Sequence, residues 1–468
     1  METSATLGRE NQVGSPENIL RRAGSVPEYT TFPPMDELTA RFEKLRGEHP
    51  QLISVQRIGA SRLGDALEMY SIGDGPLSHL VVGGVHPNEP IGAWTALHLL
   101  EQLATDDDLR TGLGARWNIV PCIDPDGTRL NEGWFANPGD RGSYARAFYR
   151  PAPNEQVEWT FPFSYKKAYF DAMMPETQAL ARAIDLTKPD LYVALHNAEM
   201  GGVYYYLTRD VPELYDLLAA VPESLGLPLD KGEPEGGHLK ELAQAIFITG
   251  SLEEVYDWVE SLGGDPFPPG SGGNASSDYA LRYGTLSLIA ELPYWKHPDA
   301  DNTAPTDESY SALLARTGAV FLDFGTELIE LLAEAEPLLT IDTPFLRGSR
   351  AFVPMMKATG ESNIARSRQP EAQRPATVAE RFGCEDLVHM FRLRFGGMLL
   401  RAFEAEVNAG TAPAELRRIT ERMLSLYTGW QREAADDDNA EVIPISSLVG
   451  VQYGAILAGA AYFAGTLT

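Results

Sequence analysis

Two histidines and one glutamate have the residue types and the spacing of a metal-binding site. His86 and Glu89 enclose two residues in the segment His86-Pro-Asn-Glu89, and His196 follows much later in the chain. Imidazole nitrogen and carboxylate oxygen are ligands that zinc takes in catalytic sites, which use three protein ligands and one water molecule. Each member alone has an ordinary explanation, as a chance His-x-x-Glu pair or as a loop histidine. The combination predicts one zinc ion held by His86, Glu89 and His196.

A further carboxylate is needed to handle the proton of a zinc-bound water. A bound zinc ion lowers the pKa of its water and polarises a substrate carbonyl. The base that takes the proton can then pass it to a leaving amine. Glu291 ends the apolar run Leu286–Ala290, and we predict that it is this general base. An ion-paired residue at the end of a strand is the alternative reading of Glu291.

Short apolar runs precede the candidate residues. They have the length and composition of buried strands and cover His79–Val85, Trp117–Ile123, Leu191–Leu195 and Leu286–Ala290. Ligands of open α/β sheets bind beyond the carboxyl ends of the strands. Helical patterns alternate with these runs, at Pro90–Leu103 and Thr177–Leu186. The sequence therefore predicts an α/β fold with a mostly buried sheet, whose strand ends converge on one crevice.

The helical content rises towards the end of the chain. We expect an N-terminal arm (residues 1–33), an α/β catalytic domain (34–337) and an α-helical C-terminal region (338–468). The last region begins with a stretch rich in Arg and Pro at 341–378, which predicts loops. Three helical patterns follow it, at Glu385–Asn408, Pro413–Ala435 and Ser446–Ala464.

Composition limits the partners and the compartment. The formal net charge of -28 argues against nucleic acid, because a nucleic-acid binder needs a cationic face. The two cysteines, Cys122 and Cys384, do not make a disulfide framework in 468 residues. The first residues contain no apolar run of the kind found in secretory signals. We therefore expect a soluble, cytoplasmic protein.

One apolar segment, Leu448–Leu467, approaches the length that spans a membrane. It contains Gln452 and many small residues and has no flanking basic cluster, which favours a buried or interface helix without membrane attachment. Its small residues, Gly450, Gly454 and Ala458, suit a contact in a homo-oligomer. A hydrolase tethered to a membrane through this segment remains the alternative.

The order of the motifs resembles the zinc carboxypeptidases of the carboxypeptidase A type over about residues 50–335. The resemblance rests on His-Pro-Asn-Glu after a strand that ends in Gly-Gly-Val, Asp124-Pro-Asp-Gly127, a strand-end histidine, Ser271-Gly-Gly273 and a strand-end glutamate. It implies a mixed sheet of about eight strands flanked by helices. It also implies zinc at His86, Glu89 and His196, with Glu291 as the base. The expected activity is that of a metallocarboxypeptidase-like hydrolase of peptide or amide bonds, in a divergent, bacterial-type member with an added helical region.

The segment that grips the substrate departs from that family. The family uses an Asn-Arg pair to bind a terminal carboxylate, whereas the comparable stretch here is Val157-Glu-Trp-Thr-Phe-Pro162. Arginine suits carboxylates, and Arg129 and Arg150 are the preferred substitutes among four nearby arginines, the others being Arg141 and Arg146. Asn197 and Tyr279 are further candidates for lining the substrate pocket. A surface arginine in a loop and ordinary aromatic packing are the alternative readings.

Two other functions remain open. The acylases typified by aspartoacylase and succinylglutamate desuccinylase share the His-x-x-Glu and the later histidine, so the substrate is either a peptide or an acyl-amino acid. A catalytically lapsed member that binds peptides is the third reading. Retention of all four site residues argues against a lapsed site.

Overall fold

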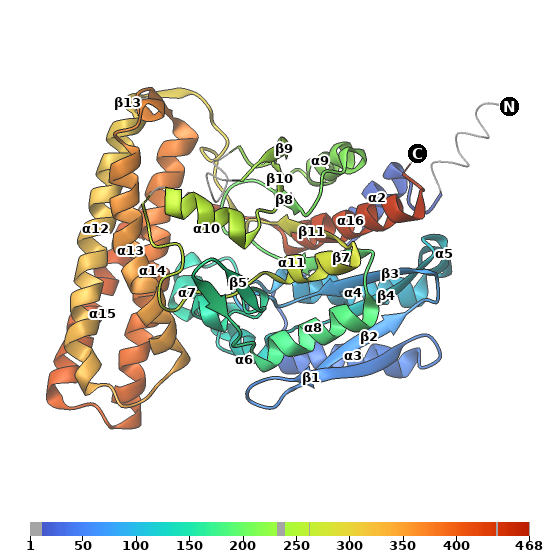
Figure 1. Ribbon diagram of the computed structural model, residues 1–468, viewed down its shortest axis with the longest axis horizontal. Helices are drawn as coiled ribbons and strands as arrows, with labels where there is room; N and C mark the ends of the chain where they lie inside the picture. The colour runs from blue at the N-terminus through green and yellow to red at the C-terminus, as the bar shows by residue number, and fades with distance from the viewer. Residues whose placement is uncertain (1–11, 232–238, 262, 437–438, 468) are drawn as a thin grey trace. The chain divides into compact units, whose positions relative to one another are not determined.

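The computed structural model describes residues 12–231, 239–261, 263–436 and 439–467 (Figure 1). These residues form two compact units. The first unit comprises the described residues up to Arg129, Asn154–Trp295 and those from Ile443 onward, and the second comprises Leu130–Pro153 and Lys296–Val442. The units are discontinuous in sequence, whereas the predicted domains at 1–33, 34–337 and 338–468 are continuous. Those domain boundaries stay a prediction.

A mixed sheet forms the centre of the first unit. Among the residues described, nine strands form it in the order β1-β2-β4-β3-β7-β11-β8-β10-β9. They are β1 (Ser54–Ala60), β2 (Ala66–Ile72), β3 (Leu77–Val82), β4 (Ala115–Val120), β7 (Leu191–Leu195), β8 (Tyr204–Leu207), β9 (Glu241–Ala243), β10 (Ile246–Ile248) and β11 (Leu286–Glu291). The expected mixed sheet of about eight strands is confirmed, with one strand more.

Four neighbouring strands of this sheet run in the same direction. β3 pairs in parallel with β4 and β7, and β7 pairs in parallel with β11. Val82 lies opposite Ala194, and Leu195 lies opposite Ala290. The carboxyl ends of β3, β7 and β11 therefore lie side by side, and the segments that follow them leave the sheet at the same edge.

Helices cover both faces of the sheet (Figure 1). Leu80 and Val82 of β3 share a core cluster with Leu180 and Ile184 of α8 (Pro175–Thr187). Side chains alternate along a strand, and the ring of His79 points to the opposite face. There it contacts α16 (Ile445–Ala464) through a ring at 6.2 Å. The helix α4 (Ile91–Thr105) contacts α16 and the strands β2, β3 and β4.

The N-terminal part that the structure describes includes a helix that the sequence analysis did not expect. This helix, α2 (Pro16–Ala23), is capped by Ser15, whose hydroxyl oxygen accepts a hydrogen bond from the backbone N–H of Asn18. Ile19 and Ala23 are buried, and α2 contacts α16. The remaining helices of the first unit are α3 (Met35–Glu48), α5 (Asp107–Gly112), α6 (Pro125–Arg129), α9 (Tyr215–Ser224), α10 (Leu252–Ser261) and α11 (Ser276–Ala280), with the hairpin β5 (Phe163–Tyr165) and β6 (Ala168–Phe170).

Long helices that pack on one another dominate the second unit (Figure 1). They are α12 (Tyr310–Ala335), α13 (Pro344–Arg366), α14 (Val378–Ala409) and α15 (Ala414–Asp436), with the shorter α7 (Arg141–Ala147) and the strands β13 (Pro305–Ser309) and β14 (Pro375–Thr377). The chain also forms two short strands, β12 (Trp295–Lys296) and β15 (Glu441–Val442).

The prediction of loops over 341–378 is wrong, because α13 occupies most of this stretch. Thr343 caps the helix and Pro344 takes its first turn, where the missing proline N–H is not needed. Glycines then allow α12 and α13 to approach each other closely. A Cβ on Gly325 would lie 2.7 Å from the backbone nitrogen of Lys357. Tertiary packing therefore stabilises a helix whose Arg and Pro content suggests a loop.

The apolar segment near the end of the chain forms α16, one helix that is long and apolar enough to cross a membrane. Inside the protein, 78% of its apolar 18-residue window is buried. Two of its small residues face other parts of the first unit. A Cβ on Gly450 would lie 2.5 Å from the carbonyl oxygen of Ala23, and one on Gly454 would lie 2.7 Å from Val221. That the protein is not attached to a membrane stays a prediction. A homo-oligomeric contact through the C-terminal helices stays a prediction as well.

The close approach of α16 to α2 leads to a stability prediction. Gly450→Ala forces a methyl group against a backbone carbonyl, which cannot move cheaply, and we expect the free energy of unfolding to fall by about 1–3 kcal/mol. Gly429→Ala is the control, because Gly429 lies in α15 and a Cβ added there would meet nothing within 4 Å. Its helix should gain about 0.5–1 kcal/mol. Chemical denaturation measures both, and an undiminished stability of Gly450→Ala would contradict the packing described.

Candidate metal centre

The turn after β3 brings His86 and Glu89 to the edge of the sheet. Gly83 and Gly84 make this turn against β4: a Cβ on Gly83 would lie 2.4 Å from the carbonyl oxygen of Pro121, and Gly84 has a φ of +65°. Glycine tolerates both the close approach and the left-handed backbone. His86 and Glu89 follow directly, and α4 begins two residues after Glu89. Local sequence thus fixes where these two side chains leave the sheet.

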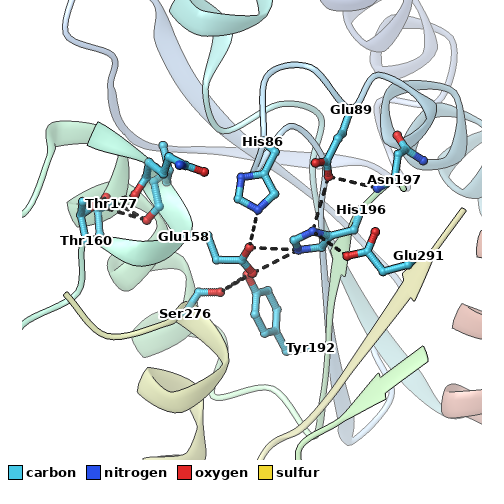
Figure 2. Close-up of polar contacts among 12 residues, drawn as sticks. His86, Glu89, Glu158, Thr160, Thr177, Tyr192, His196, Asn197, Ser276 and Glu291 are labelled. Atoms are coloured by element: carbon cyan, nitrogen blue, oxygen red, sulfur yellow. Dashed lines mark hydrogen bonds and ion pairs between the residues drawn. The ribbon is translucent and has the colours of Figure 1, made fainter. Parts of the chain in front are cut away.

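His196 joins them from the end of β7. The potential ligand atoms of His86, Glu89 and His196 all lie within 4.8 Å of one another, and the three side chains are buried (Figure 2). The backbone N–H of Asn197 donates a hydrogen bond of 3.0 Å to Glu89 Oε2. The predicted trio is therefore brought together, with the carboxylate of Glu89 oriented by the residue that follows His196.

The two ring nitrogens of His196 face different carboxylates. Its Nδ1 lies 3.4 Å from Glu89 Oε2 and 3.5 Å from Glu291 Oε1. Its Nε2 lies 3.0 Å from Glu158 Oε2, on the other edge of the ring (Figure 2). One imidazole gives one nitrogen to a metal ion and its other N–H to a carboxylate, a carbonyl or water. This arrangement would leave Nδ1 of His196 for an ion and the Nε2 proton for Glu158.

Glu158 is the site residue that the sequence analysis missed. Its Oε2 also lies 3.1 Å from His86 Nε2, so one carboxylate contacts both histidines. The hydroxyl of Ser276 donates to Glu158 Oε1 at 3.3 Å, and Tyr192 donates in turn to Ser276 at 3.0 Å. Glu158 is only 2% exposed. No local signal singles it out, because Glu155 and Gln156 precede this segment and Thr160 follows Trp159.

The charges at the centre depend on one another. Burial alone would raise the pKa of Glu158, but the charges and hydrogen bonds of His196 and His86 outweigh it and hold that pKa below its usual range. Burial likewise disfavours the protonated form of His196, but Glu158, Glu291 and Glu89 raise its pKa well above the usual value. Protons and a metal ion therefore compete for the same donor atoms, as expected of a metal site.

Glu291 lies on the same side of His196 as Glu89. It is the last residue of β11, is 7% exposed and pairs in register with Tyr204 of β8. Its carboxylate shares the Nδ1 edge of His196 with the carboxylate of Glu89. A base for a metal-bound water must reach the position of that water, and this edge is where the water would be held. The position of Glu291 is compatible with the predicted role.

The residues predicted to bind substrate are less well placed. Arg129 forms ion pairs with Asp36 at 2.8 Å and with Asp65 at 3.1 Å, so carboxylates of the chain occupy its guanidinium group. Arg150 belongs to the second unit. In that unit, Arg141 pairs with Asp386 and Arg146 pairs with Glu404.

The two predicted pocket residues have structural contacts of their own. The side-chain oxygen of Asn197 accepts hydrogen bonds of 3.3 Å from the backbone N–H of Ile91 and from the hydroxyl of Tyr294. In Figure 2 the Asn197 side chain points away from His86 and Glu158. Tyr279 donates its hydroxyl to Asp185, and the guanidinium group of Arg282 lies 3.6 Å above its ring. Their substrate-binding roles stay predictions.

A family model matches the part of the chain that carries most of this site. The model described as "zinc carboxypeptidase" matches residues 38–231, a range that contains His86, Glu89, Glu158 and His196. This part of the chain belongs to the zinc carboxypeptidase family. Glu291 lies beyond the matched range, so its assignment as part of the site rests on its position next to His196.

Individual zinc carboxypeptidases are similar to the chain at low identity. Carboxypeptidase B of Astacus astacus is 27% identical over 107 residues, which cover 21% of the chain and 35% of that protein. Zinc carboxypeptidase A 1 of Anopheles gambiae is 24% identical over 307 residues, 60% of the chain and 63% of that protein. The matches thus span less than two thirds of the length of these curated relatives.

Solved structures of carboxypeptidases also align with the chain. The carboxypeptidase A from Helicoverpa armigera covers 78% of this chain and 80% of its own, with 14% identity and a TM-score of 0.39. A metallo-carboxypeptidase from Burkholderia cenocepacia covers 55% and 60%, with 18% identity and a TM-score of 0.34. The assignment to the zinc carboxypeptidase family rests on the sequence match and not on these superpositions.

The family implies zinc, and the residues present fit it. Two imidazoles and a carboxylate are borderline-soft and hard donors of the kind that zinc takes, and all three are buried within one small volume. Glu158 supplies the outer carboxylate that orients ligating histidines. The number of ions stays a prediction of one.

The double contact of Glu158 leads to a prediction about metal affinity. Glu158→Gln keeps the shape of the side chain but removes the charge that holds both Nε2 protons. Loss of an outer partner typically costs 10–100-fold in metal affinity, and we expect a zinc dissociation constant raised by about that factor in a chelator competition.

Glu155→Gln is the matched control for this experiment. Glu155 lies three residues away in the same segment, and its carboxylate pairs with Arg62 at 3.6 Å. Its zinc affinity should equal that of the wild type. Equal affinities of the Glu158→Gln variant and the wild type would show that the carboxylate does not orient the ligands.

Proposed function

We propose that the protein is a zinc-dependent hydrolase of peptide or amide bonds, similar to a metallocarboxypeptidase. The single observation that supports this best is the shared edge of His196. Glu89 Oε2 and Glu291 Oε1 approach the same ring nitrogen at 3.4 and 3.5 Å. A ligand and a second carboxylate therefore stand next to each other, as a hydrolase needs for a ligand and a base.

Zinc, when bound, supplies Lewis acidity that makes a water molecule nucleophilic and polarises the amide carbonyl. Glu291 accepts the proton that the water gives up and delivers it to the leaving nitrogen as the carbon–nitrogen bond breaks. Glu158 holds the Nε2 protons of His86 and His196, which keeps both rings oriented. The backbone N–H of Asn197 holds the carboxylate of Glu89. Water and amide thereby yield a carboxylate and an amine.

The proposed base predicts a loss of turnover without a loss of metal. Glu291→Gln keeps the size of the side chain but cannot accept the proton, and proton transfer by a positioned group contributes about 10²–10⁴-fold. We expect kcat to fall by roughly that factor while zinc analysis finds the wild-type metal content. Glu241→Gln, at an exposed position on β9 of the same sheet, is the control. Full activity of a zinc-loaded Glu291→Gln variant would refute the role.

The proposed substrate class follows from the ion pairs that the candidate arginines form. Three of the four candidates, Arg129, Arg141 and Arg146, form ion pairs with carboxylates of the chain itself. The stretch comparable to the one where the family carries its Asn-Arg pair, Val157–Pro162, contains no arginine. We propose that the enzyme cleaves an amide without selecting a free carboxylate beside the scissile bond. This separates it from exopeptidases that depend on such a grip.

Matched substrates test this selectivity. A chromogenic peptide with a free terminal carboxylate and the same peptide with an amidated end should be hydrolysed with kcat/KM values within about threefold. A hydrogen-bonded charge pair is worth about 1.5–3 kcal/mol, so a true carboxylate grip would make the amidated peptide roughly 10–150-fold poorer. Such a drop, abolished by Arg150→Ala, would assign the grip to Arg150. No hydrolysis of either peptide or of acyl-amino acids with zinc bound would favour a lapsed site.

A further inference from the structure

A buried glutamine interrupts the most apolar helix of the chain. Gln452 lies in the middle of α16 and is 1% exposed. Its neighbours in the helix are apolar or small, and none of the 20 residues carries a charge. A buried side-chain amide costs free energy unless its donors and acceptor find partners. The partners of Gln452 therefore tell what the residue is for.

Both ends of the Gln452 amide are engaged, and they reach two other elements. Its Nε2 donates a hydrogen bond of 2.8 Å to the backbone carbonyl oxygen of His196. Its Oε1 accepts one of 2.6 Å from the hydroxyl of Thr95 on α4. A carbonyl oxygen only accepts, so the NH₂ group must face His196, and this fixes the orientation of the amide. The glutamine bridges α4 and the end of β7.

The carbonyl that accepts from Gln452 belongs to the peptide unit between His196 and Asn197. The same unit carries the backbone N–H of Asn197, which donates to Glu89 Oε2 at 3.0 Å. One peptide plane thus has its oxygen held by α16 and its hydrogen directed at a candidate metal ligand. A rotation of this plane would change the backbone torsion ψ of His196 and move the N–H donor that orients Glu89 at the same time. Hydrogen bonds in such chains also polarise one another.

We propose that Gln452 is a positioning residue of the metal centre, acting through the peptide that joins His196 to Asn197. The network closes on itself, because Thr95 belongs to α4 and Glu89 lies two residues before the first residue of that helix. The candidate ligands Glu89 and His196 are therefore tied to each other through α16 as well as directly. By this reading, the apolar C-terminal helix carries a component of the metal site.

The proposal rests on the proposed metal site but not on any substrate. Its readouts are the zinc dissociation constant from chelator competition and the visible spectrum of the cobalt-substituted protein, which reports ligand geometry. A wild-type protein that binds metal and hydrolyses nothing would contradict the proposed function and leave this inference standing.

Gln452→Leu and Gln452→Met in the full-length protein keep the volume and the helix and remove the donor. We expect each to weaken zinc binding about tenfold or more and to change the cobalt spectrum, since losses of outer partners typically cost 10–100-fold. Residual hydrolysis should show a lower kcat at a similar KM. Wild-type affinity and spectrum in either folded variant would overturn the proposal.

Two further variants make the test decisive. Tyr453→Phe removes a hydroxyl from the next residue of α16, whose ring contacts His98 and not the centre, and it should match the wild type in both readouts. Thr95→Val removes the outer bond and leaves Gln452 beside His196, so an intermediate effect is expected. Should neither Gln452 variant fold, the Thr95→Val variant decides. An unchanged zinc affinity and cobalt spectrum would overturn the proposal, and a weaker affinity with a changed spectrum would support it.

Discussion

The burial of three carboxylates beside two histidines is the constraint on which the site depends. Glu89, Glu158 and Glu291 are 3%, 2% and 7% exposed. Like charges in a medium of low dielectric constant repel strongly, and each needs a cation or donors to remain ionised. The histidines, the backbone N–H of Asn197 and Ser276 meet part of that need. A divalent cation would balance two of the three charges and so lower the cost of burying the cluster.

The strand-end residues of the site were readable from the sequence for a physical reason. His86, His196 and Glu291 each follow an apolar run that has to be a buried strand, and parallel neighbours bring such ends to one edge. The resemblance to zinc carboxypeptidases is confirmed by the family model over residues 38–231, and the mixed sheet by the observed strand order. The local pattern was sufficient to find these residues, because each one directly follows the apolar run that forms its strand.

Glu158 and Gln452 could not be found in that way. Their meaning lies in partners far along the chain: Glu158 acts on His86 and His196, and Gln452 acts on the carbonyl of His196. Neither has a neighbour in sequence that signals a site. The helix α13 was missed for a related reason, since the approach of Gly325 to Lys357 is a contact between helices and not a local preference. The sequence therefore predicted the strands that end at the site and the residues Glu89 and Glu291, whereas the contacts between elements that hold the site could not be predicted from it.

The docking of α16 has a consequence for the order in which the protein can assemble. During synthesis the ligand segments and Glu291 come first, then residues 296–442 of the second unit, and only then the helix that covers β7 and β11. Until that helix is made, the contacts of α16 with these strands are absent and the carbonyl of His196 lacks the Gln452 donor. Domains generally fold as units and in the order of synthesis, and the first unit receives its last helix only after residues 296–442 have been made. The metal centre is therefore finished late, although its ligands are translated early.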